Sequence, residues 1–174
     1  MLIRPARPDD AAALSELAAL TFPLACPPDA LPESIAEFIA STLTQAHFEG
    51  YLADPDRELF VADEEGALVG YTMLVHGEPY DSDVRAVVTA RPATELSKVY
   101  VHPDHHGAGL AAQLVERSVA AARARGAVVV WLGVNQQNER ANRFYAKQGF
   151  ERVGTKRFKV GARFEDDFVR ALAL

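Results

Sequence analysis

The chain has 174 residues and a mass of 18.9 kDa, a length that favours one domain over two and allows a core of its own. With 49% hydrophobic and 24% charged residues, its composition excludes collagen-like, mucin-like and disordered chains. The N-terminus reaches Asp9 and Asp10 before any apolar run of signal-peptide length, and no stretch is apolar enough to span a membrane. The single Cys26 excludes an internal disulfide. We therefore expect a cytoplasmic protein without a membrane partner.

The formal net charge of −6 argues against a nonspecific nucleic-acid binder, and we expect no nucleic-acid partner. The charge is distributed unevenly along the chain. Residues 1–97 carry 5 Lys and Arg against 17 Asp and Glu, whereas residues 98–174 carry 13 against 7. An acidic first half and a basic second half are suited to a cationic ligand and an anionic ligand respectively, although solvated faces that merely differ in charge would give the same pattern.

The first half of the chain alternates short strand and helix patterns. The proline-rich segment at 22–32 predicts a loop, and the polar segment at 77–93 predicts a flexible connection. The remaining elements predicted there are a strand at 1–6, a helix from Asp10 to Leu20, an amphipathic helix from Ile35 towards His47, and hairpin strands at 58–62 and 67–75.

The second half reads as a β-α-β-α run followed by a hairpin. Its predicted elements are a strand at 96–101, a helix at 109–125, a strand at 128–134, a helix at 139–148, and strands at about 150–160 and 164–172. Gly126 and Gly149 end the two helices, and Gly161 forms the last turn. Because no linker or repeat interrupts the chain, the sequence predicts one α/β domain over residues 1–174.

A glycine loop follows the strand at 96–101. The loop runs from His106 to Ala111 and contains Gly107 and Gly109, and a helix begins directly after it. Glycines let a ligand approach the backbone closely, and the free N–H groups of a first helical turn favour an anion. The loop therefore predicts a phosphate site, or else it is only a tight turn.

The same loop spells G-x-G-x-x-A from Gly107 to Ala112, which is a permitted dinucleotide-binding pattern. A nicotinamide-binding unit requires an acidic residue at the end of the next strand, where it accepts hydrogen bonds from the ribose hydroxyls. Here that strand is followed by Asn135, and no second nucleotide-binding half precedes the loop. This context disfavours the dehydrogenase interpretation.

A second motif lies on the helix at 139–148 and its flanks. Together with the glycine loop, it resembles the GCN5-related N-acetyltransferase (GNAT) superfamily, whose loop reads Gln/Arg-x-x-Gly-x-Gly/Ala. The helix matches the superfamily pattern at Asn138, Ala141, Tyr145, Gly149 and Phe150. The resemblance implies a mixed central sheet flanked by helices, with acetyl-CoA as cosubstrate and no metal.

The loop departs from the superfamily at its head, where His106 stands in place of Gln or Arg. A neutral imidazole supplies less positive charge, so acetyl-CoA affinity is expected to be weaker or to depend on pH. His102, His105 and His106 also suggest a metal site, but Pro103 and the loop give them no fixed ligand spacing.

The resemblance also assigns roles to particular residues. The Val99 amide is the expected oxyanion donor, and Tyr145 is the expected acid that protonates the departing thiolate. Asn138 contacts the cosubstrate or caps its helix. The remaining expected acetyl-CoA contacts are the main chain of Tyr100 and Val101 and the loop residues His106, Gly107, Ala108, Gly109, Leu110 and Ala111.

Glu95 begins the strand that carries Val99, and strict alternation would put residues 95, 97, 99 and 101 on one face. By resemblance Glu95 is a general base or an anchor for the substrate ammonium; a solvated strand-end glutamate is the alternative. Cys26 as an acyl-accepting nucleophile is disfavoured, because no basic residue is near it in sequence.

Within the superfamily, the chain looks most similar to bacterial spermine/spermidine acetyltransferases. The likeness lies in Thr21-Phe22, the segment Trp131-Leu132-Gly133-Val134, and the tail residues Phe158, Gly161 and Asp167. A small cationic amine is therefore the expected acceptor, with Glu33, Glu37, Asp81 and Asp83 as candidate anchors. A protein N-terminus, a lysine or an aminoglycoside stays open as acceptor, as does a non-catalytic acetyl-CoA-binding module. We expect a monomer or a homodimer.

Overall fold

The computed structural model of the protein describes residues 1–174 and contains one seven-stranded mixed sheet in the order β1-β2-β3-β4-β5-β7-β6. Its strands are β1 (Leu2–Pro5), β2 (Arg57–Glu64), β3 (Ala67–His76), β4 (Ala93–Val101), β5 (Val129–Asn135), β6 (Glu151–Val160) and β7 (Arg163–Ala173). Its helices are α1 (Ala11–Ala25), α2 (Pro32–Thr42), α3 (Gln45–Ala53), α4 (Ser82–Val87), α5 (Leu110–Ala124) and α6 (Glu139–Lys147). The predicted α/β class, with a mixed sheet flanked by helices, is confirmed.

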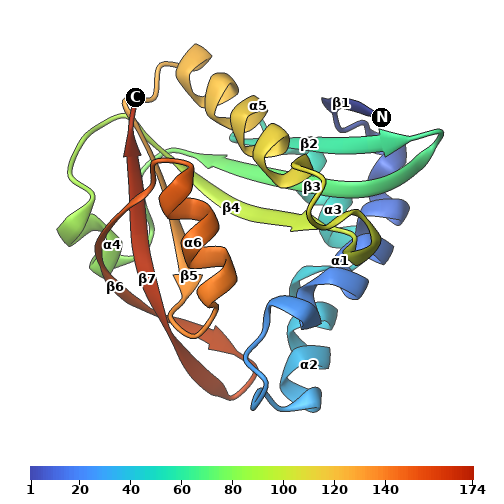
Figure 1. Ribbon diagram of the computed structural model, residues 1–174, viewed down its shortest axis with the longest axis horizontal. Helices are drawn as coiled ribbons and strands as arrows, with labels where there is room; N and C mark the ends of the chain where they lie inside the picture. The colour runs from blue at the N-terminus through green and yellow to red at the C-terminus, as the bar shows by residue number, and fades with distance from the viewer.

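Helices cover both faces of the sheet. α5 and α6 lie on the face turned to the viewer in Figure 1, where Leu110 and Leu114 of α5 join a core with Leu96 and Leu132. α1 and α3 lie on the opposite face and pack with Tyr71 and other residues of β2 and β3. None of the helices combines the length and apolar character that crossing a bilayer requires.

The region predicted as a loop at 22–32 begins as helix, because α1 continues through Pro23 to Ala25. The buried Phe22 side chain stacks on Phe38 of α2 at a ring-centroid distance of 4.4 Å. This tertiary contact lies in the last turn of α1, where a proline removes only one hydrogen bond of a helix that is ending. The prediction that the helix stops near Leu20 was therefore wrong.

Two further helices correct the sequence prediction. The helix expected from Ile35 towards His47 is two helices, since α2 ends at Thr42 and the Thr44 hydroxyl accepts the His47 N–H to cap α3. The segment at 77–93 is not a flexible connection: it contains α4, and Val84 of that helix is fully buried in a cluster with Trp131.

β4 and β5 are paired only at their beginnings. The parallel register runs from Ala93 opposite Val129 to Glu95 opposite Trp131, and the two strands then separate (Figure 1). β3 stays paired with β4 throughout, while β7 stays paired with β5. The sheet therefore opens along the second half of β4.

Candidate active site

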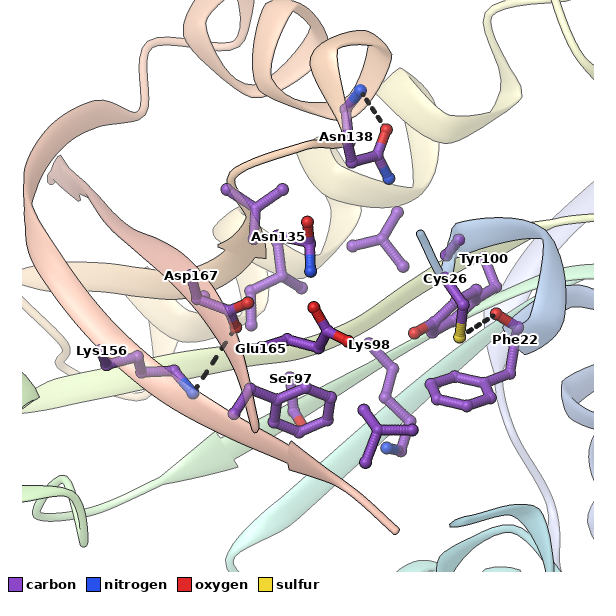
Figure 2. Close-up of a pocket in the computed structure, with 18 of the residues that line it drawn as sticks. Phe22, Cys26, Ser97, Lys98, Tyr100, Asn135, Asn138, Lys156, Glu165 and Asp167 are labelled. Carbon is purple, nitrogen blue, oxygen red and sulfur yellow. Dashed lines mark hydrogen bonds and ion pairs between the residues drawn. The ribbon is translucent and has the colours of Figure 1, made fainter. Parts of the chain in front are cut away.

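Two adjoining cavities, each of about 210 Å³, occupy the opening between β4 and β5. The first, which we call the acid-lined cavity, is lined by Glu95, Glu165 and Asp167. Figure 2 shows the carboxyl groups of Glu165 and Asp167 facing this cavity. The second, which we call the loop cavity, reaches His106 at the glycine loop. The residues lining both cavities are Ala25, Val99, Tyr100, Asn138, Ala141 and Tyr145. A molecule bound in one cavity is therefore adjacent to a molecule bound in the other.

The main chain of β4 offers donors to this opening. The His102 N–H donates to Val69 O on β3 at 2.8 Å. Because the N–H groups of an antiparallel strand alternate in direction, the Tyr100 N–H also faces β3, whereas the amides of Val99 and Val101 face the opening. These two amides lie where β5 has already separated from β4.

The glycine loop ends at the N-terminus of α5. Gly109 is the N-cap with φ +76°, and Gly107 has φ +83°; both angles are costly for any residue with a Cβ. The Leu110 side chain turns into the core, and Ala111 lines the loop cavity. The free amides of this helical turn favour an anion beside the loop cavity. Ala108 is exposed in the same loop.

His106 is held by two hydrogen bonds of opposite polarity. Its Nδ1 lies 3.1 Å from Arg140 Nη1, and its Nε2 lies 2.8 Å from the carbonyl oxygen of Val101. A guanidinium only donates and a carbonyl only accepts, so the imidazole is neutral with its proton on Nε2. His106 thereby holds the Arg140 cation at the edge of the loop cavity, which both residues line.

Tyr145 lies in the wall between the two cavities. Its ring packs edge-on against Phe144 and Phe150, at centroid distances of 5.2 and 6.0 Å. Burial raises the pKa of the phenol well above its ordinary value. Tyr145 is therefore protonated throughout the neutral pH range, as a general acid must be.

Asn138 meets both expectations that the sequence left open. Its Oδ1 accepts the Ala141 N–H at 3.1 Å and caps α6, and the residue also lines both cavities. The cap fixes the first turn of α6, which carries Ala141 and Arg140 to the cavity walls.

The model of the GNAT acetyltransferase family matches residues 14–150 of the chain. An N-acetyltransferase of unknown role from Mycobacterium tuberculosis is 49% identical over 160 residues, which cover 92% of this chain and 95% of that protein. The chain belongs to the GNAT family. It is an N-acetyltransferase by this relationship, as the glycine loop and the α6 motif predicted.

Two further comparisons extend this result. The L-amino acid N-acyltransferase MnaT of Escherichia coli is 33% identical over 169 residues, covering 94% of this chain and 87% of that protein. The crystal structure of PaiA N-acetyltransferase from Thermoplasma acidophilum, solved with coenzyme A, has a TM-score of 0.78 at 18% identity and covers 99% of this chain and 98% of that chain. The latter likeness establishes the fold of this acetyltransferase. No comparison shows the predicted likeness to spermine/spermidine acetyltransferases.

The strict alternation expected for β4 in this acetyltransferase was wrong. Met73 is opposite Lys98 and Leu74 is opposite Leu96, so Ser97 is an extra residue in a β-bulge. The bulge puts Val99 and Val101 with Leu96 in the core under α5, not on the face of Glu95. Glu95 still lines the acid-lined cavity; burial raises its pKa, and Lys156 and Lys98 oppose the rise.

The four acids predicted to anchor the acceptor lie outside both cavities. Glu33 and Glu37 are exposed on α2, which presents Phe38 to the acid-lined cavity. Asp81 caps α4 by accepting the Asp83 N–H at 2.8 Å. Asp81 is nevertheless close enough for its charge to contribute to the raised pKa of Glu95.

The acid-lined cavity holds four charged residues that the sequence analysis did not assign to the site. They are Lys98, Lys156, Glu165 and Asp167. The signal that was available is the alternation on β7, where Glu165 and Asp167 share the inward face with Val169. Burial lowers the pKa of Lys98 to about 8 and raises that of Asp167 to about 6, although Lys156 attracts the latter carboxylate.

Cys26 also lines the acid-lined cavity. Burial, with a contribution from Glu165, raises the pKa of its thiol to about 11. Because the thiolate is the reactive form of cysteine, this environment disfavours Cys26 as a nucleophile.

Proposed function

We propose that the protein transfers an acetyl group directly from acetyl-CoA to a small primary amine. The observation that carries this proposal is the shared wall of the two cavities, in which the Val99 amide and the Tyr145 phenol lie between the glycine loop and the buried carboxylates. The loop cavity suits the cosubstrate because the amides of α5 and the Arg140 guanidinium supply donors for phosphate oxygens. PaiA, which shares this fold, was solved with coenzyme A.

Three groups of the chain divide the chemistry in this proposal. The Val99 N–H donates to the oxygen that gains negative charge when the amine attacks, a kind of contact worth about 3 kcal/mol in other enzymes. Tyr145 supplies the proton to the departing thiolate. Glu95, with its raised pKa, accepts a proton from the acceptor ammonium or holds that ammonium before it is deprotonated.

A polyamine is the first candidate acceptor. It is supported by the three carboxylates that face the acid-lined cavity, because buried carboxylates require a cation to balance them.

An amino acid is the second candidate. It is supported by Lys98, whose ammonium is a partner for a carboxylate in the same cavity, and by the name of the relative MnaT. An aminoglycoside is also a polycation, so the same carboxylates support it as a further candidate. A protein terminus or a protein lysine stays a weaker candidate.

The first test replaces the proposed acid. Tyr145→Phe should lower kcat by about 100-fold to 10,000-fold while acetyl-CoA binds with nearly unchanged affinity, because only the leaving-group proton is lost. Thiol release measures turnover against a panel of amines that includes spermidine and amino acids, and calorimetry measures acetyl-CoA binding.

Tyr51→Phe is the matched control, since the Tyr51 hydroxyl donates to Thr42 O away from both cavities. Unchanged turnover in Tyr145→Phe would show that Tyr145 is a packing residue. Acetyl-CoA binding without turnover on any amine would favour a non-catalytic binding module.

A further inference from the structure

Glu165 and Asp167 are neighbours on one face of β7, and both carboxylates turn into the acid-lined cavity (Figure 2). Their side chains are only 6% and 7% exposed. A strand in the middle of a sheet alternates its side chains, and the inward positions are normally apolar, as Val169 is two residues later. Two successive inward carboxylates are therefore a costly feature of this strand.

Each carboxylate has an oxygen without a hydrogen-bond partner. Glu165 Oε1 lies 3.3 Å from Arg163 Nε, but the two atoms do not have hydrogen-bond geometry. Asp167 Oδ1 has no partner, and Oδ2 has only the Lys156 ammonium at 3.7 Å, which Figure 2 marks with a dashed line. Unsatisfied buried carboxylate oxygens are rare because each costs the full free energy of desolvation.

The cations of the chain do not complete this site. Lys156 pairs with Asp167 and lies over the Phe158 ring, at 5.2 Å from its centroid. Arg163 forms ion pairs with both Glu165, at 3.3 Å, and Asp29, to which it donates at 2.7 Å, so two carboxylates share its single charge. The pair Glu165 and Asp167 thus keeps an excess of negative charge that faces the cavity.

We propose that Glu165 and Asp167 bind a second ammonium group of the acceptor, which makes the acceptor a diamine or polyamine. This inference rests on the proposed function and names the substrate class of the same site. Neither residue lines the loop cavity, whereas Tyr145 and Val99 line both. The ammonium that these carboxylates hold is therefore remote from the acetyl group, and the nitrogen that reacts is the one beside Tyr145 and the Val99 amide.

The test compares an amine that has a second ammonium with one that lacks it. Glu165→Gln and Asp167→Asn should each raise the KM for spermidine by about 10-fold or more, because a charge-assisted hydrogen bond is lost. Both variants should leave the KM for propylamine within about twofold and kcat nearly unchanged, since the reacting nitrogen keeps its surroundings. Glu37→Gln, at an exposed acid outside both cavities, is the matched control.

Asp167→Asn also removes the partner of Lys156, so acetyl-CoA affinity measured by calorimetry reports whether each variant is folded. Glu165→Gln leaves the Lys156 pair intact and tests the inference even where the other variant does not fold. An equal loss with spermidine and propylamine would overturn the inference, and so would no loss with either amine.

The outcomes separate this inference from the proposed function. A wild-type protein that acetylates both amines with equal kcat/KM supports the enzyme and overturns the diamine site. A wild-type protein that turns over no amine contradicts the proposed function; in that case calorimetry of spermidine with the wild type and Glu165→Gln tests the ammonium site directly. Spermidine binding that is unaffected by Glu165→Gln would overturn the inference there too.

Discussion

At the first position of the glycine loop, His106 and the neighbouring Arg140 together take the place of the Gln or Arg of the family pattern. His106 stands where the family pattern has Gln or Arg, and its two hydrogen bonds make it neutral. The positive charge at this edge of the loop cavity comes instead from Arg140, in the first turn of α6, whose guanidinium the imidazole orients. Comparison of the motif at position 106 alone indicates the loss of a positive charge. In the structure, Arg140 of α6 supplies a positive charge at the same place.

His106→Ala should weaken acetyl-CoA binding by about fivefold, because an oriented hydrogen bond is worth about 1 kcal/mol. Calorimetry measures the acetyl-CoA affinity of His106→Ala, Arg140→Ala and the double variant, and so tests whether His106 acts through Arg140. If His106 acts by holding Arg140, the double variant should lose little more than Arg140→Ala alone. Additive losses would show that the two side chains act independently.

At the scale of elements, the turn between β6 and β7 supports the helix that bounds the cavity. Gly161 has φ +61°, and a Cβ there would lie 2.8 Å from the Cβ of Ser34 on α2. The same helix presents Phe38 to the acid-lined cavity, and Phe38 also meets Phe158 of β6 at a centroid distance of 5.5 Å. The turn and α2 are therefore packed as one wall.

Gly161→Ala should lower the free energy of unfolding by about 2–4 kcal/mol, the sum of left-handed strain and overpacking against α2. Urea unfolding measures the change. Gly66→Ala is the matched control, because Gly66 also has a positive φ of +94° but no atom lies within 4 Å of its Cβ position. Gly66→Ala should lower the free energy of unfolding by only about 1 kcal/mol. Equal losses would mean that contact with Ser34 contributes nothing.

The elements that the sequence predicted well are those with local signals. α5 and α6 combine hydrophobic periodicity with a cap or a terminal glycine, and β5 is a run of consecutive apolar residues. The observed bounds of all three lie within a residue or two of those expected. α4 and the extension of α1 were missed because the burial of Val84 against Trp131 and of Phe22 against Phe38 stabilises them. Such contacts join distant segments and leave no local pattern.

The site residues divide in the same way, into those that belong to a local sequence motif and those that tertiary structure brings to the cavity. Tyr145 and Asn138 belong to a motif on one helix, so they could be predicted from the sequence. Glu165, Asp167 and Lys98 reach the cavity through the pairing of β5 with β7 and through the bulge at Ser97. A bulge shifts every following side chain to the other face, and periodicity alone does not reveal it.

At the scale of the whole molecule, the acidic and basic halves of the chain meet in one cavity. Glu95 comes from the acidic half, whereas Lys98, Lys156, Glu165 and Asp167 come from the basic half. The charge of the site is therefore set by tertiary structure and not by the composition of either half. The charged groups around Asp167 are Lys156 on β6 with Glu165 and Asp166 on β7, and those around Lys98 are Glu95 on the same strand and Arg57 on β2.

These surroundings predict how acceptor preference depends on pH. Burial raises the pKa of Asp167 to about 6, so the carboxylate is neutral below that pH and negative above it. Burial lowers the pKa of Lys98 to about 8, so its positive charge is lost above that pH. Both changes make the cavity more negative as pH rises. The ratio of kcat/KM for spermidine to kcat/KM for propylamine should therefore rise through about pH 6 and again through about pH 8.

The ratio is the quantity to measure, from about pH 5 to about pH 9, because deprotonation of the reacting amine affects both substrates and largely cancels. Spermidine keeps a second ammonium over most of this range, since alkylammonium groups titrate near pH 10.4, as lysine does. Asp167→Asn should abolish the lower rise, and Lys98→Met should abolish the upper one, each leaving the other in place. A ratio that is flat over the whole range in the wild type would show that neither Asp167 nor Lys98 acts on the bound acceptor. A lower rise that persists in Asp167→Asn would assign it to another carboxylate, of which Glu95 is the nearest candidate by its raised pKa.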